Sequence, residues 1–244
     1  MQRLPNKELT YEQIIHLLNY YKISKGAEAV VCEGPTDYSV YKIFVENFDV
    51  AEMPDNKEKK VNLIYQADLD FSTKILSTIS CNGKLVGYEM SSKPFLMSYK
   101  IETLLFDNEE LLHYFKQTKK ILEYFKSKGI IYGDFDPRNI LIDRRTGEIM
   151  FCDMDNIEIE GCPMDIIPWD LYDYKENRGI DFGVHPYMHN IILLKTLSED
   201  IYTINPFTRK RLFHRPSKAI IESMKDVESF NDKYLIDYVK KLSR

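Results

Sequence analysis

Apolar residues follow two different periods along this chain, and the change from one to the other separates a strand-rich first part from a helix-rich later part. Near the N-terminus, Ile14, Leu17 and Leu18 recur at helical spacing behind the capping box formed by Thr10 and Gln13, which predicts a short amphipathic helix. Short apolar runs bounded by turn residues then predict strands at 30–33, 38–45, 73–79 and 85–90.

Beyond residue 90 the spacing becomes helical. Residues 91–94 interrupt the strand pattern, and Asn108 begins an apolar stripe that ends at Gly129. Two short apolar runs at 140–142 and 149–152 then flank a tight turn, which predicts a hairpin.

Carboxylate and amide side chains gather around this predicted hairpin. Asp134 and Asn139 precede its first strand, Asp153 follows its second strand, and Asp155 comes two residues later. The hairpin would bring Asn139 and Asp153 to the same end of adjacent strands. Phosphoryl transfer needs one group that orients the attacking hydroxyl and two oxygen ligands for magnesium. The alternative, solvated acidic residues at strand ends, is disfavoured because both groups occur at this spacing.

The segment Tyr-Gly-Asp-Phe-Asp-Pro-Arg-Asn at 132–139, with Asp-Met-Asp at 153–155, resembles the H-R-D-L-x-x-x-N and D-F-G motifs of the protein-kinase-like superfamily. It is most similar to atypical bacterial kinases and aminoglycoside-phosphotransferase-like kinases, in which Gly replaces the Arg. The resemblance implies that Asp134 orients the acceptor hydroxyl and that Asn139 and Asp153 bind magnesium, with Asp155 as a further or alternative metal ligand.

The sequence also departs from this family pattern. Tyr132 stands where the family has His, and Asp136 stands where protein kinases usually carry Lys. The second change weakens the case for a protein serine or threonine as the phosphate acceptor.

Residues of the first part match the nucleotide side of such a site. Lys42 lies in an apolar strand, on the face of Val40 and Phe44, where the family keeps the lysine that grips the α- and β-phosphates; an edge-strand lysine that discourages aggregation is the alternative. Gly26 lies where the family has its glycine-rich loop, although a plain turn at a strand entry explains it equally well.

Three further assignments follow from the resemblance. Glu58, on a predicted helix at 56–66, is the best candidate to pair with Lys42, although the spacing puts the expected position nearer Val61 and a solvated charge is an equal alternative. The backbone of Glu89 and Ser91 would contact adenine at the hinge between the two lobes. Asp181 would brace the catalytic loop from the following helix.

Composition narrows the class of protein. The chain has 244 residues, enough for one large domain or two lobes, and its 44% hydrophobic and 29% charged residues are ordinary for a soluble globular protein. A net charge of -5 argues against general nucleic-acid binding. The four cysteines lack metal-ligand spacing and are read as reduced core residues, so we expect a cytoplasmic location. No apolar stretch approaches eighteen residues, so we expect no membrane contact.

We therefore expect an α+β, two-lobed, protein-kinase-like fold, with an antiparallel-sheet lobe and its N-terminal helix at 1–90 and a mainly helical catalytic lobe at 91–244. The expected activity is transfer of the γ-phosphoryl group of ATP, with Mg²⁺, to a hydroxyl of a protein or small molecule that the sequence does not identify. ATP and this acceptor are the expected partners.

Two other functions stay open. One is a pseudokinase that binds partners or nucleotide without transfer. It fits the glycine-rich loop, in which Ser24 and Ala29 replace the outer glycines, and it fits Tyr132 and the lack of the A-P-E sequence that ends a kinase activation segment. A haloacid-dehalogenase-type phosphatase would use Asp153 as nucleophile and Asp155 as acid–base, but the rest of the chain offers little of the parallel-strand pattern that this fold needs.

Overall fold

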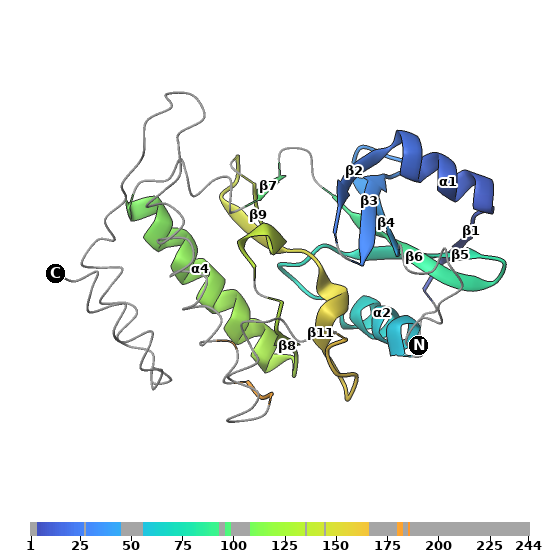
Figure 1. Cartoon of the computed structure of the whole chain (residues 1–244). Helices are drawn as coiled ribbons and strands as arrows, with labels where there is room; N and C mark the ends of the chain where they lie inside the picture. The colour runs from blue at the N-terminus through green and yellow to red at the C-terminus, as the bar shows by residue number, and fades with distance from the viewer. Residues whose placement is uncertain are drawn as a thin grey trace.

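The computed structural model describes residues 4–26, 28–44, 56–92, 96–98, 108–134, 136–143, 145–165, 180–182 and 185. Over these residues the protein is α+β, with one mixed six-stranded sheet, two smaller sheets and helices packed against them (Figure 1). Within these ranges no helix is both long and apolar enough to cross a membrane.

The six-stranded sheet has the order β1-β5-β6-β4-β3-β2. Its strands are β1 (Asn6–Glu8), β2 (Lys22–Lys25), β3 (Ala29–Glu33), β4 (Ser39–Phe44), β5 (Ile75–Cys81) and β6 (Lys84–Ser91). The predicted β3–β4 and β5–β6 hairpins are confirmed. Asn82 and Gly83 at the second turn both have positive φ, 51° and 73°, as a tight hairpin turn requires.

The sheet departs from prediction at one edge. The sequence predicted an antiparallel sheet, but the short β1 pairs with β5 in the parallel direction, so the sheet is mixed. Thr78 fixes this pairing from β5, because its backbone N–H and its hydroxyl both donate to the carbonyl of Pro5, just before β1. A three-residue strand has too little periodicity to be recognised from sequence.

Helices α1 (Tyr11–Tyr20) and α2 (Asn56–Ala67) cover opposite faces of this sheet (Figure 1). The predicted capping box of α1 is confirmed, since the Thr10 side chain accepts from the backbone of Gln13 and the Gln13 side chain accepts from the backbone of Thr10. Ile14 of α1 packs in one apolar cluster with Cys32, Tyr41, Ile43 and Ile79 of the sheet.

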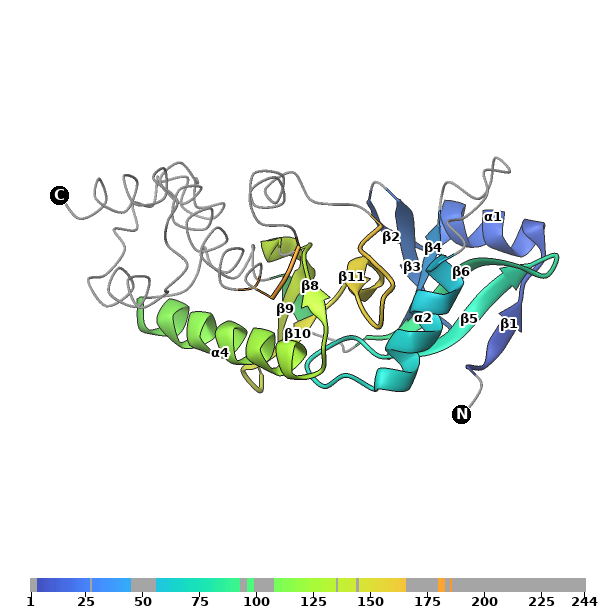
Figure 2. The ribbon, with the colours of Figure 1, turned by 90° about the horizontal axis from the view of Figure 1, so that it is seen from below.

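The second part of the chain is built on α4 (Asn108–Ser127), which runs beside the two small sheets (Figure 2). One sheet has the order β10-β9-β7 and the other pairs β11 with β8. Their elements are β7 (Leu96–Ser98), β8 (Ile131–Tyr132), β9 (Ile140–Asp143), β10 (Glu148–Phe151) and β11 (Ile157–Glu158). The predicted hairpin before Asp153 is confirmed as the antiparallel pair β9–β10.

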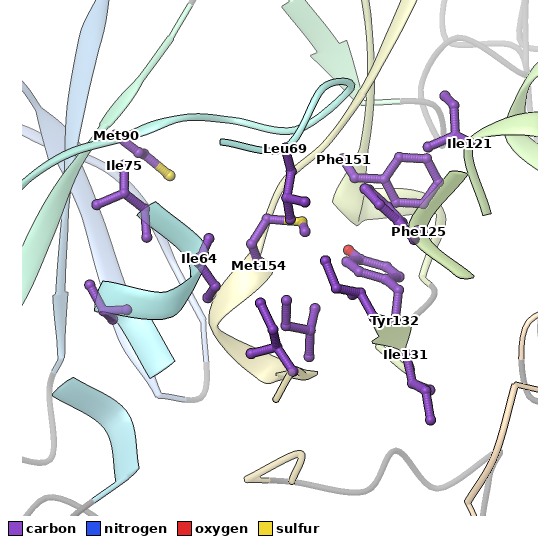
Figure 3. Packing of buried hydrophobic residues seen from close by; sticks show 14 of the residues in the cluster. Ile64, Leu69, Ile75, Met90, Ile121, Phe125, Ile131, Tyr132, Phe151 and Met154 are labelled. Atoms are coloured by element: carbon purple, nitrogen blue, oxygen red, sulfur yellow. The ribbon is translucent and has the colours of Figure 1, made fainter. Parts of the chain in front are cut away.

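A single apolar cluster joins the two parts. It runs from Ile75 and Met90 of the large sheet, through Met154, to the aromatic rings of Phe125 and Phe151 beside α4 (Figure 3). Met154 belongs to the short turn η3 (Met154–Asn156) and is buried. The residues that follow β10 are therefore anchored between the large sheet and α4, and this anchoring positions the acidic side chains on either side of Met154.

Candidate active site

Side chains from three distant segments meet beside the turn η3. Lys42 comes from β4, Asp134 and Asn139 come from the segment between β8 and β9, and Asp153 and Asp155 flank Met154 after β10. The Nζ atom of Lys42 donates to Oδ1 of Asp153 and to Oδ1 of Asp155. The fold thus joins a strand of the large sheet to residues more than a hundred positions later.

Lys42 is a buried, charged residue of an interior strand. Strand β4 pairs with β3 on one side and β6 on the other, so the reading of Lys42 as an edge-strand residue is wrong. Although burial opposes the charge, the carboxylates of Asp155 and Asp153 raise the pKa of Lys42 well above its ordinary value. The lysine therefore carries its positive charge into the interior of the protein.

Asp155 is completely buried and is held by two hydrogen-bond donors and by one further ion pair. Lys42 and the Tyr88 hydroxyl, the latter at 3.0 Å, both donate to Oδ1. Nζ of Lys57 from α2 lies 2.9 Å from Oδ2. Burial alone would raise the pKa of this carboxyl, but Lys42 and Lys57 outweigh it, so the pKa of Asp155 is lowered and the group stays ionised.

Asp153 has a different environment. Its side chain keeps 34% of its surface exposed, compared with 1% for Asp155. Burial raises the pKa of Asp153 to about 6, with Lys42 opposing this change and Asp155 adding to it. Its backbone is left-handed, with φ 61° and ψ 42°, a conformation that costs a non-glycine residue about 1–2 kcal/mol and that is concentrated at functional sites.

The segment between β8 and β9 presents a carboxylate bound to an amide. Nδ2 of Asn139 donates to the backbone carbonyl and to Oδ2 of Asp134, both at 3.1 Å. Because the amide nitrogen is used in these bonds, the amide oxygen is the atom left to bind a cation. The backbone N–H of Cys152 donates to the carbonyl of Asn139 at 2.9 Å, which ties Asn139 to the residue just before Asp153.

The surroundings of Asp134 favour the protonated form of its carboxyl. Burial, and then the neighbouring charge of Asp136, raise the pKa of its carboxyl above the ordinary value, while the Asn139 hydrogen bond opposes this change. Asp136 itself is held by Arg138, whose Nε lies 2.8 Å from its Oδ1. The negative charge of Asp136 is therefore paired with a positive charge two residues away.

Tyr132 anchors the start of this segment through its hydroxyl and its backbone N–H. Its hydroxyl donates to the carbonyl of Cys152 at 2.7 Å, and its backbone N–H donates to Nε2 of His185 at 2.9 Å. His185 is buried, whereas Asp181, the residue expected to brace this segment, is exposed. The acceptor of this backbone N–H is therefore the imidazole of His185, and the role expected of Asp181 stays a prediction.

The expected partner of Lys42 is also different. Glu58 is exposed on α2 and Val61 belongs to the apolar core, so the predicted pairing of Glu58 with Lys42 is wrong. Instead, α2 places Lys57 beside Asp155 and Lys60 beside Asp165. Sequence reasoning missed both lysines because the run at 56–60, Asn-Lys-Glu-Lys-Lys, is typical of a solvated helix face.

The residues expected to bind the base and the phosphates of a nucleotide take part in the backbone pairing of the large sheet. Gly26 lies between β2 and β3, and its N–H donates to the Ala29 carbonyl at 2.8 Å, as in a plain hairpin turn. Glu89 pairs with Tyr41 on one side and with Ser77 on the other.

The N–H of Ser91 donates to the Lys74 carbonyl at 2.7 Å, so this group is not available to adenine. The assignment of the hinge to Glu89 and Ser91 is therefore wrong, because β6 continues through Ser91.

Comparison with known proteins adds no relative. No protein-family model and no curated protein matches the chain. Among the described residues there is also no group of three or more His, Cys, Asp or Glu side chains placed to hold a metal ion. The expected magnesium ligands are Asn139, Asp153 and Asp155, and both oxygens of Asp155 face lysines. Asp153 and Asn139 supply one carboxylate and one amide, so water and phosphate oxygens would have to complete the set, as is usual for Mg²⁺.

Proposed function

We propose that the protein is an ATP- and magnesium-dependent phosphotransferase with a two-lobed, protein-kinase-like fold. The observation that carries this proposal is the contact of Lys42 with Asp153, beside the bonded pair Asp134–Asn139. In the proposal Lys42 binds phosphate, Asp153 binds magnesium and Asp134 orients the hydroxyl, and these are the groups that phosphoryl transfer requires.

The order of the elements supports the proposal. Lys42 lies on the third strand of the run β2-β3-β4, followed by helix α2 and the hairpin β5–β6. Helix α4 then leads into β8, the segment with Asp134, and the hairpin β9–β10 that ends before Asp153. This is the succession that the kinase-like resemblance implies, with lobes at 1–90 and 91–244.

Each residue has a chemical role in the proposal. The acceptor hydroxyl oxygen forms a bond to the γ-phosphorus while the bond from this phosphorus to the bridging oxygen breaks and ADP leaves. Asp134 orients the hydroxyl and takes its proton, which its raised pKa favours. Lys42 exchanges its contact with Asp153 for phosphate oxygens. Asp153 and the amide oxygen of Asn139 would hold Mg²⁺, which would neutralise phosphate charge.

Asp155 is assigned to Lys42 rather than to the metal. Its carboxylate is buried, and both of its oxygens already face lysines. It therefore takes the part that the sequence had assigned to Glu58. The same burial argues against the phosphatase alternative, in which Asp155 would act as acid–base, and the antiparallel pair β9–β10 differs from the parallel sheet of that fold.

Thermal unfolding with and without ATP and Mg²⁺ tests the proposal. At about 100 times the dissociation constant, a bound nucleotide adds roughly 2.7 kcal/mol, which corresponds to a rise of about 5–10 °C for a chain of this size. We expect the rise to need Mg²⁺ and to be lost in Asp153→Ala. Asp68→Ala is the matched control, because Asp68 is an exposed carboxylate that pairs only with Lys74 among the described residues.

Transfer is tested on the same proteins with a panel of protein and small-molecule hydroxyl acceptors. Phosphorylated product that disappears in Asp134→Asn supports the enzyme. Nucleotide binding without transfer to any acceptor would favour the pseudokinase, and no magnesium-dependent binding at all would refute the proposed site.

A further inference from the structure

Two buried lysines of helix α2 lie among carboxylates next to the candidate site. Nζ of Lys57 lies 2.9 Å from Asp155, 2.9 Å from Asp165 and 3.6 Å from Glu28. One turn further along the helix, Nζ of Lys60 lies 2.7 Å from Asp165 and also donates to the carbonyl of Pro163. Both lysines are buried, so these contacts are screened little by solvent.

The contacts form one chain in which charges alternate. From the helix toward the solvent, the order is Lys60, Asp165, Lys57, Asp155, Lys42 and Asp153. Three lysines thus meet three aspartates. Buried charges need such pairing, because an uncompensated ion in the protein interior costs several kcal/mol.

The two α2 lysines occupy different places in this chain. Lys57 contacts Asp155, which in turn holds Lys42. Lys60 contacts Asp165 and the Pro163 carbonyl and has no described contact with Asp155. Only Lys57 is therefore placed to affect the phosphate-binding lysine.

We propose that Lys57 is a positioning residue that makes the charge of Lys42 available to the nucleotide phosphates. Asp155 carries one negative charge and has Lys57 on one oxygen and Lys42 on the other. Because Lys57 lies against Oδ2 of Asp155, it competes with Lys42 for the charge of this carboxylate. Lys42 is then neutralised less completely and keeps more of its positive charge for a polyphosphate. Without Lys57, Asp155 would neutralise Lys42 more fully and weaken its attraction for an anion. This inference rests on the proposed function.

Lys57→Met and Lys60→Met test this role as a matched pair. Each removes one buried ammonium group from the same helix and keeps much of the apolar stem. The quantity to measure is the dissociation constant of ATP with Mg²⁺, by titration calorimetry at a temperature where every variant is folded. For Lys57→Met we expect it to rise about tenfold or more, the equivalent of one charged hydrogen bond. For Lys60→Met we expect a similar loss of thermal stability with the dissociation constant unchanged.

The outcomes separate this inference from the proposed function. If wild type binds ATP and Mg²⁺ and both variants bind equally well, the α2 lysines serve stability alone and the inference is wrong. An equal loss of affinity in both variants also contradicts it, because Lys60 does not contact Asp155. If wild type itself shows no magnesium-dependent binding, the proposed function fails and the inference fails with it.

A second variant keeps the test decisive if Lys57→Met does not fold. Tyr88→Phe removes only the hydroxyl that donates to Asp155 at 3.0 Å and preserves the ring in the core. If Asp155 orients Lys42 as proposed, the loss of this donor weakens ATP binding by a few fold, about the effect of one neutral-donor hydrogen bond. An unchanged dissociation constant in Tyr88→Phe would count against the role of Asp155, and so against the role of Lys57.

Discussion

The two faces of the six-stranded sheet are built from alternate residues of the same strands, yet they differ in chemistry. On the face covered by α1, Tyr41 and Ile43 of β4 pack in an apolar cluster with Ile14. On the face covered by α2, Lys42 lies between them in sequence and reaches Asp153 and Asp155. A single strand therefore contributes apolar packing on one side and buried charge on the other.

The difference indicates where the function lies. Apolar contacts stabilise a fold without burying any charge. Each buried ion, in contrast, must be compensated by an opposite charge and contributes little net stability. The face covered by α1 buries one carboxylate, Glu89, which pairs with Lys7. The alternating chain of three lysines and three aspartates lies on the face covered by α2, and we expect it to serve chemistry more than stability. The α1 face should thus respond to substitution through stability, and the α2 face through binding and turnover.

The largest effect is expected for turnover on the α2 side of the sheet. Asp134→Asn keeps the shape of the side chain but removes the group that accepts the hydroxyl proton. We expect turnover to fall by about 10²–10⁴-fold, the usual contribution of a general base, with the ATP dissociation constant nearly unchanged. Initial rates at saturating ATP and Mg²⁺ measure this, with Asp68→Asn as the control. Undiminished turnover would show that Asp134 is not the hydroxyl-orienting residue.

The opposite response is expected for Ile43→Ala on the α1 face. Ile43 is completely buried one residue after Lys42. Removing its side-chain atoms should lower the free energy of unfolding by about 2–5 kcal/mol, through lost burial and the cavity left behind. Urea denaturation measures the loss, and ATP binding below the unfolding transition should match wild type. Weakened binding in the folded variant would erase the distinction between the two faces.

Local patterns in the sequence were sufficient to predict the backbone elements that carry the candidate site. The hairpins, the α1 cap and the grouping of Asp134, Asn139 and Asp153 depend on short segments whose period and turn residues are visible directly. The contacts that were missed join residues far apart. Lys57 meets Asp165 across 108 positions and Tyr132 meets His185 across 53. A contact between residues so far apart leaves no periodic pattern in the local sequence. In addition, a lysine-rich helix start is typical of a solvated surface.

The brace at His185 predicts a dependence of stability on pH. Burial, and in addition the charge of Lys126 on α4, lower the pKa of His185 to about 4, against a backbone contact with Leu122 that raises it. The unfolded chain then binds this proton near pH 6.5 and the folded chain only near pH 4. Stability should be complete above about pH 6.5 and fall through this window, by up to about 3 kcal/mol.

Urea denaturation between pH 4 and pH 7 measures this effect. His185→Gln removes the titrating group while keeping an acceptor for the Tyr132 N–H, so the difference between variant and wild type isolates the contribution of the imidazole. We expect the variant to lose the part of the pH dependence that lies between pH 6.5 and pH 4. Identical slopes in the two proteins would mean that His185 is protonated as readily in the fold as in the unfolded chain.

The smallest effect is expected at the start of α1, at the periphery of the apolar face. Thr10→Ala removes the side-chain half of the capping box, in which the Thr10 hydroxyl accepts from the Gln13 N–H at 3.3 Å. The loss should be about 1 kcal/mol of unfolding free energy, with Thr10→Ser as the control that keeps the hydroxyl. ATP affinity should be the same in all three proteins, because α1 packs on the face of the sheet that Lys42 does not reach. A change in affinity from so distant a cap would mean that the two faces are coupled through the strands between them.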